Sequence, residues 1–433
     1  RALINNNQLP NKNAVRIEEF ITYFDYHYEQ PKGNDPVAVS TEVAASPWNA
    51  NLRLVRIGLQ AATIPISQLP ASNLVFLIDV SGSMNSENRL PLVKKSLNLL
   101  VEQLRPQDNV TLVVYAGAAG TVLEPTAGNK KEIIKAAIEN LSAGGSTAGG
   151  AGIELAYKQA LKNLVKGGNN RVILCTDGDF NVGASSDAAL QTLIEEKRKT
   201  GVFLSCLGFG MGNYKDNKME TMADKGNGNY AYIDNILEAK KVFVNEFGGT
   251  LFTVAKDVKL QVEFNPNLVQ AYRLIGYENR ALRNEDFNDD TKDAGDMGSG
   301  HTVTALYEIM PKDAKSTYLA AVDSLKYQTL IPNKAAESNE LLTVKIRYKQ
   351  PNSDKSQKIE HILLNSTKSF AEASENFRFA AAVAEFGLLL RQSAFKGTAT
   401  YGQVKDLAKT ALGKDAEGYR EEFIQLVKKM ELL

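Results

Sequence analysis

Residues 74–84 have the sequence LVFLIDVSGSM. Residues 74–78 are apolar without a polar break, which is typical of a strand that is covered on both faces. The run ends at Asp79, and two hydroxyl side chains, Ser81 and Ser83, follow closely. Carboxylate and hydroxyl oxygens at the end of a buried strand suit a hard divalent cation such as Mg²⁺. The same pattern also fits a turn in which Asp and Ser side chains bond to local backbone groups, so the other strand ends must decide.

Length and composition limit the classes of protein to consider. A chain of 433 residues is long enough for two or three folded units. Its 50 basic residues balance its 50 acidic residues, so we expect no binding to nucleic acid or to anionic membrane through overall charge. No apolar run approaches the roughly 20 residues that span a bilayer. The chain begins at Arg1 rather than Met, so we expect an upstream segment, such as a signal peptide or lipid anchor, to precede it.

The cysteines and histidines give no sign of a zinc or catalytic site. Cys175 and Cys206 both lie in apolar, strand-like runs, so we expect buried free thiols rather than a disulfide framework. The three histidines, His27, His301 and His361, are far apart and have no zinc-ligand spacing. We therefore interpret them as ordinary surface or core residues.

The hydrophobic pattern divides the chain into four regions. Residues 1–72 contain a short amphipathic helix and two strand-like runs, and residues 73–250 alternate between strand and helix. Such alternation predicts an α/β, Rossmann-like, doubly wound and mainly parallel sheet with helices on both faces. Residues 251–365 are β-rich and residues 366–433 are helical. We expect the two β-rich regions to pack together as one sandwich-like unit into which the α/β domain is inserted, because each alone has few strands.

Two further loops of the α/β region supply oxygen atoms. The sequence LSAGGSTAGGAG, residues 141–152, places Ser146 and Thr147 among five glycines just before a predicted helix. Asp177 follows the apolar run RVILCT, in the same position on its strand as Asp79 on its own. Because carboxyl ends of parallel strands meet at one edge of a sheet, these loops should converge there. The convergence favours the metal site over the simple turn.

With these motifs, residues 73–250 resemble a von Willebrand factor type A domain. DVSGS at residues 79–83, then Thr147, then TDG at residues 176–178 match the motif of the metal-ion-dependent adhesion site (MIDAS) of that family. The flanks resemble those of the bacterial YfbK-like group. The segments that carry this second resemblance are AVRIEEFITYFDY, DAGDMGSGHTVTALYEI and ENFRFAAAVAEFG.

The resemblance implies a metal-dependent protein-binding module, for adhesion or assembly, in the cell envelope of a bacterium, periplasmic or surface-exposed. The cation would be Mg²⁺, with Mn²⁺ and Ca²⁺ as alternatives. Two carboxylates roughly neutralise a divalent ion, and an open coordination position would take an Asp or Glu side chain of a protein partner. The implied ligands are Asp79, Ser81, Ser83, Thr147 and Asp177.

Two alternatives remain. One is a structural scaffold whose metal site is closed or vestigial. The other is a metal-dependent hydrolase, since phosphatases of the haloacid-dehalogenase type also begin with an apolar strand and an Asp. Those enzymes carry a second acidic residue two positions later, where this chain has Ser81, and no histidine lies near the motifs to act as a general base. The glycine loop also lacks the G-K-[ST] ending of a P-loop. We therefore expect the chain not to be an enzyme.

Overall fold

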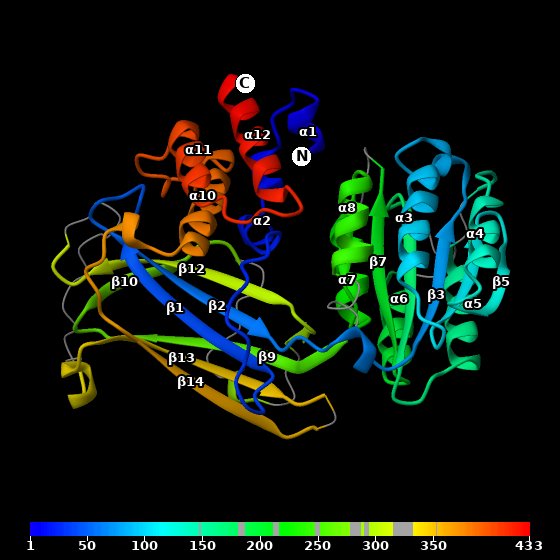
Figure 1. The fold of residues 1–433 in the computed structure, drawn as a ribbon, viewed down its shortest axis with the longest axis horizontal. Coiled ribbons are helices and arrows are strands. Elements are labelled where there is room, and N and C mark those ends of the chain that lie inside the picture. Colours follow the sequence, from blue (N-terminus) through cyan, green and yellow to red (C-terminus); the bar gives the residue numbers. More distant parts are fainter. Residues whose placement is uncertain are drawn as a thin grey trace. The chain divides into compact units, whose positions relative to one another are not determined.

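The chain forms two compact units in a computed structural model (Figure 1). Ile64–Thr253 make up one unit, and the chain on both sides of this segment, Arg1–Thr63 and Val254–Leu433, makes up the other. The structure describes residues 1–146, 149–180, 187–210, 216–246, 252–277, 287–289, 294–314, 332–351 and 353–433.

The first unit is a six-stranded sheet with helices on both faces (Figure 1). The strand order is β5-β4-β3-β6-β7-β8, and only the edge strand β5 runs antiparallel to its neighbour. Its strands are β3 (Ser72–Asp79), β4 (Asn109–Tyr115), β5 (Ala119–Ala127), β6 (Asn169–Thr176), β7 (Val202–Phe209) and β8 (Tyr230–Ile233). Its helices are α3 (Leu90–Gln103), α4 (Lys131–Glu139), α5 (Gly149–Lys162), α6 (Asp187–Arg198), α7 (Asp216–Lys225) and α8 (Ile236–Lys240).

Strand β3 lies near the middle of this sheet, and every one of its residues is buried. Phe76 and Ile78 face one hydrophobic core, shared with α3, α4 and α8. Val75 and Leu77 face the other, shared with α5, α6 and α7. Because successive side chains of a strand point to opposite faces, burial on both sides requires an unbroken apolar run. Burial of each such side chain stabilises the folded state by roughly 1.5 to 3 kcal/mol. This burial holds the strand that ends at Asp79 within the sheet.

The second unit contains two antiparallel four-stranded sheets. In one sheet, strands from before and after the inserted unit pair directly, with Ile57 opposite Ala305 (Figure 1). The strand order of this sheet is β1 (Val37–Ala45), β2 (Arg53–Ala61), β12 (Thr302–Pro311), β10 (Val269–Leu274). The order of the other is β11 (Gly295–Gly298), β9 (Thr253–Phe264), β13 (Glu340–Lys349), β14 (Ser356–Leu364). A ring contact between Phe264 and Tyr307 joins the two sheets.

Helices near both ends of the chain form the remaining core of this unit. They are α1 (Ala2–Asn5), α2 (Ile17–Thr22), α10 (Glu375–Leu390), α11 (Tyr401–Thr410) and α12 (Tyr419–Leu432). Phe24, Phe379 and Phe423 meet at edge-to-face angles in this core. The helix α10 is buried on nearly all sides, because it packs against α2, α11, α12 and strand residues at once.

The predicted fold class is confirmed: a mainly parallel α/β sheet interrupts a β-rich unit that ends in helices. Cys175 and Cys206 are buried free thiols, as expected, and burial raises the pKa of both. No helix within the described parts of the chain has the length and apolar character needed to cross a membrane.

Candidate metal centre

The candidate site lies where the order of strands in the parallel sheet reverses. From β3 the chain builds β4 and β5 on one side, and it then returns to place β6 on the other side of β3. In such sheets, ligands bind in the crevice at the carboxyl ends of the two strands that flank the reversal. Asp79 is the last residue of β3 and Asp177 directly follows β6. Both carboxylates therefore belong to the strand ends that flank this reversal.

Three neutral donors hold the fully buried carboxylate of Asp79. Its Oδ1 accepts a hydrogen bond from the backbone N–H of Ser81 at 2.9 Å. Its Oδ2 accepts from the hydroxyls of Tyr115 at 3.1 Å and Thr176 at 3.2 Å. Burial raises the pKa of Asp79, the bonds from Ser81 and Tyr115 oppose that rise, and the charge of Asp177 adds to it. None of the donors carries positive charge, so they orient the carboxylate without neutralising it.

The two predicted serine ligands lie beside each other. The hydroxyl oxygens of Ser81 and Ser83 are 3.1 Å apart, and Ser81 is buried. A short 3₁₀ turn that begins at Gly82 brings them together. The backbone N–H of Gly82 donates to the carbonyl of Gly145 at 3.0 Å, so the glycine-rich loop lies directly against this turn.

The glycine-rich loop reaches the site through its backbone. Gly144 donates its N–H to the carbonyl of Val80 at 2.8 Å, and Gly145 has φ = +85°, a conformation that favours glycine. Ser146, which directly precedes Thr147 in this loop, is exposed. Thr147 itself lies outside the described residues, so its place as a ligand stays a prediction.

Asp177 already has a cationic partner. Its Oδ2 lies 3.0 Å from the guanidinium of Arg89, and its Oδ1 accepts from the backbone N–H of Asp179 at 3.3 Å. Its side chain is only 5% exposed. The carboxylate is therefore fixed at the rim of the site by one charged and one neutral donor.

The oxygen atoms of the site fit a hard divalent cation. Two carboxylates and two hydroxyls come from the ends of neighbouring strands, and Mg²⁺ prefers such ligands. A buried carboxylate that no cation neutralises costs free energy, and a divalent ion would remove this cost for Asp79. In the described part of the chain no three His, Cys, Asp or Glu residues are grouped for a metal. A cation here would thus depend on hydroxyl ligands as well as on the two carboxylates.

The sequence analysis missed Tyr115 and Arg89, and it named Thr176 only as part of the TDG motif, without a role. Thr176 and Tyr115 end β6 and β4, on either side of β3, and both donate to Asp79. Arg89 directly precedes α3. A tyrosine at the end of the apolar run NVTLVVY was a visible feature, but its role depends on β4 lying next to β3. Arg89 lies beyond the Ser83 turn, and no pattern indicated that its side chain folds back.

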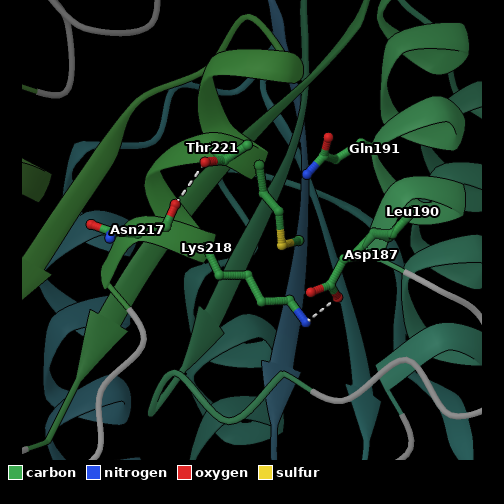
Figure 2. Close-up of a pocket in the computed structure, with 7 residues that line it drawn as sticks. Asp187, Leu190, Gln191, Asn217, Lys218 and Thr221 are labelled. Carbon is green, nitrogen blue, oxygen red and sulfur yellow. Dashed lines mark hydrogen bonds and ion pairs between the residues drawn. The ribbon is translucent and has the colours of Figure 1, made fainter. Parts of the chain in front are cut away.

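A separate pocket of about 240 Å³ lies between α6 and α7 and contains none of the predicted ligands (Figure 2). Lys218 points across it and donates to the carboxylate of Asp187 at 2.7 Å and to the carbonyl of Phe180 at 3.0 Å. Thr221 bonds to the backbone of its own helix at Asn217. These contacts link the two helices to the segment that follows Asp177.

Three family models match separate parts of the chain. Residues 249–433 match the family model "Uncharacterized protein YfbK, C-terminal", and residues 73–244 match that of the von Willebrand factor type A domain. A third model, named von Willebrand factor, matches residues 1–56.

Individual relatives differ in how much of the chain they share. The uncharacterized protein YfbK of Escherichia coli is 45% identical over 437 residues, which is 99% of this chain and 74% of that protein. The human inter-alpha-trypsin inhibitor heavy chain H4 is 31% identical over 153 residues, 32% of this chain and 16% of that protein. Among solved structures, a von Willebrand factor type A protein from Catenulispora acidiphila covers 91% of each chain at 17% identity and a TM-score of 0.45.

Proposed function

Because the chain belongs to the family of Escherichia coli YfbK and contains a von Willebrand factor type A domain, we propose that it binds a partner protein through a divalent cation. Type A domains commonly mediate interaction between proteins or adhesion. The proposed cation is Mg²⁺, which Mn²⁺ or Ca²⁺ could replace. The proposed ligands are Asp79, Ser81, Ser83, Thr147 and Asp177.

The observation that carries this proposal is the environment of Asp79. Its buried carboxylate accepts three hydrogen bonds, all from neutral groups, and stands at the strand reversal beside a pair of serine hydroxyls. Asp177 is near enough that its charge acts on Asp79. Two carboxylates close together are unfavourable in a buried place unless a cation lies between them. A divalent ion balances both charges and leaves a position for an outside ligand.

The partner side chain that fits this arrangement is a carboxylate. With two protein carboxylates and a divalent ion the net charge of the centre is close to zero, and the serine hydroxyls add none. An Asp or Glu of another protein can therefore complete the coordination shell without strong repulsion from negative charge at the site. The cation itself would then be part of the contact between the two proteins.

The residues around the site favour a binding function over a catalytic one. Residues 64–253 contain no histidine, and all three histidines belong to the other unit. The relatives named above carry no enzymatic name. The location that goes with this function is the bacterial cell envelope, where fractionation of the source cells should recover the protein.

Calorimetric titration of Mg²⁺ and of Mn²⁺ tests the cation site. Asp79→Asn keeps the size of the side chain, but it removes the charge and replaces one accepting oxygen with an NH₂ donor. We therefore expect at least about 100-fold weaker binding, or about 2.7 kcal/mol. Asp187→Asn, which changes an exposed carboxylate of the same unit, should bind as the wild type does. Equal affinities for the wild type and Asp79→Asn would contradict the proposal.

Affinity capture tests the partner. The full chain should retain a protein from envelope extract in Mg²⁺ and release it in EDTA, and the Asp79→Asn variant should retain none. Capture that survives both EDTA and Asp79→Asn would mean that the partner binds elsewhere.

One observation favours a second function, a scaffold with a closed site. The ion pair between Arg89 and Asp177 already neutralises one of the two carboxylates. If this pair persisted at all times, the domain would fold without a cation and bind none. Absence of heat with either ion in the wild type would support this alternative.

A further inference from the structure

Arg89 joins the two loops that carry the proposed carboxylate ligands. One nitrogen of its guanidinium lies 2.5 Å from the carbonyl oxygen of Ser83 and 3.0 Å from Oδ2 of Asp177. Ser83 belongs to the turn after β3, and Asp177 follows β6. A single cationic group thus bridges the two strand ends that a metal ion would also bridge.

The end of a third strand leaves room for this side chain. Gly210 directly follows β7 and has φ = +90°, and a Cβ atom there would lie 2.6 Å from Nε of Arg89. Only glycine therefore allows the guanidinium to lie where it does. The side chain of Arg89 is 23% exposed, compared with 5% for Asp177, so the pair is partly shielded from water. A shielded ion pair is screened less by salt than one on the open surface.

We propose that Arg89 is a built-in competitor of the cation, which holds Asp177 when no cation is bound and weakens the binding of the cation when one is present. This inference rests on the proposed function. A divalent ion near Asp177 is repelled by the guanidinium, and it must share a carboxylate that Arg89 already holds. In return, the pair keeps the loop after β6 in place without a metal.

The same charge favours an acidic partner. A divalent ion with two carboxylates is neutral, and the guanidinium of Arg89 beside them makes the filled site positive by one charge. The empty site carries one net negative charge, if both carboxylates are ionised. Binding of the cation would therefore reverse the sign of the charge that an approaching Asp or Glu meets.

Titration of Mn²⁺ into the full chain, followed by calorimetry, tests the competition. Arg89→Gln should bind Mn²⁺ at least about tenfold more tightly than the wild type, since removal of one nearby charge affects a divalent ion strongly. Without metal, the melting temperature of the same variant should be about 2 to 4 °C lower, because Asp177 has lost its cationic partner. Saturating Mn²⁺ should remove this deficit.

Three further variants separate charge from structure. Arg89→Lys keeps the positive charge and should stay within about threefold of the wild type in Mn²⁺ affinity. Arg89→Met keeps the apolar stem against Gly210 and should bind as tightly as Arg89→Gln, so it replaces that variant if Arg89→Gln does not fold. Arg198→Gln removes one positive charge from the far end of α6 and should leave the Mn²⁺ affinity unchanged.

The outcomes distinguish this inference from the proposed function. Equal or weaker Mn²⁺ binding by both Arg89→Gln and Arg89→Met would overturn the competition, even while the wild type binds and Asp79→Asn does not. Tight binding by Arg89→Lys would also overturn it, because the charge would then not matter. If neither the wild type nor the Arg89 variants bind Mn²⁺, the cation site itself fails and the inference fails with it.

Discussion

Asp79 and Glu385 are both fully buried carboxylates, one in each unit, and their surroundings are opposite. Asp79 ends a strand and accepts three hydrogen bonds. Glu385 lies in the middle of α10, inside the hydrophobic core of the other unit. Neither of its oxygens has a hydrogen-bond partner among the described residues, although the backbone N–H of Thr400 lies near enough to lower its pKa. The effect of burial is larger than that of Thr400, and it raises the pKa of Glu385 to about 8.

The difference shows what makes a buried acid a binding group. Burial raises the pKa in both cases, and at Asp79 the hydrogen bonds from Ser81 and Tyr115 oppose that rise without cancelling it. At Glu385 the apolar surroundings favour the protonated form at neutral pH. The donors orient the carboxylate of Asp79 at a strand end, where a cation can bind it, whereas the carboxyl group of Glu385 lies among apolar side chains in a helical core. Burial alone therefore does not indicate function.

The largest effect that follows from this comparison is a pH dependence from Glu385. Its pKa is about 8 in the folded chain and 4.5 as the reference for the unfolded chain, so between these values the folded state binds more protons. Stability must then fall as pH rises through this range and level off above pH 8. The fall between pH 5 and pH 8 has an upper limit of about 3.5 kcal/mol. Urea unfolding of the wild type at both pH values measures it.

Glu385→Gln serves as the reference, because it cannot ionise and keeps nearly the same volume. The gap in stability between the variant and the wild type should widen from pH 5 to pH 8 in favour of the variant. The same gap at both pH values would mean that Glu385 is solvated or paired, and the contrast with Asp79 would then disappear.

A smaller effect is expected from the donors that hold Asp79. Tyr115→Phe removes one of three hydrogen bonds and keeps the ring, which packs edge-to-face on Phe180 at 5.5 Å. A hydrogen bond to a charged group contributes about 1.5 kcal/mol or more, so we expect roughly tenfold weaker Mg²⁺ binding. Calorimetry with Mg²⁺ measures the change.

Tyr157→Phe is a matched control in the same hydrophobic core. The hydroxyl of Tyr157 is buried and has no hydrogen-bond partner among the residues that the structure describes. Its removal should therefore leave Mg²⁺ binding unchanged and should not destabilise the chain. If both variants bound Mg²⁺ as the wild type does, the donors to Asp79 would have no part in the site.

The sequence predicted those features that depend on neighbouring residues. The apolar run before Asp79 shows that its strand is buried on both faces, and the serines follow within the same turn. Asp177 directly follows another such run. Parallel strands place their carboxyl ends at one edge, so these residues could be assigned to one site before their contacts were known.

The features that the sequence did not predict depend on which elements become neighbours. Tyr115 reaches Asp79 only because β4 pairs with β3 in this register. Arg89 reaches Asp177 because the segment after β3 lies beside the segment after β6. The burial of Glu385 depends on α2, α11 and α12 packing around α10. Local pattern determines the strands, and packing partners determine the environment of each charge.

The smallest effect on Mg²⁺ binding is expected from a substitution of Lys218. It tests whether the α6–α7 pocket affects the cation site. Its ammonium joins Asp187 to the carbonyl of Phe180, whose ring packs on Tyr115 beside Asp79. Lys218→Met removes these bonds but keeps the stem, and a partly exposed ion pair contributes at most about 1 kcal/mol, so stability should fall by no more than this. Mg²⁺ affinity should change by less than about twofold, because Phe180 is held by its burial in the core. A loss of Mg²⁺ affinity as large as that of Tyr115→Phe would instead mean that the α6–α7 pocket controls the cation site through Phe180.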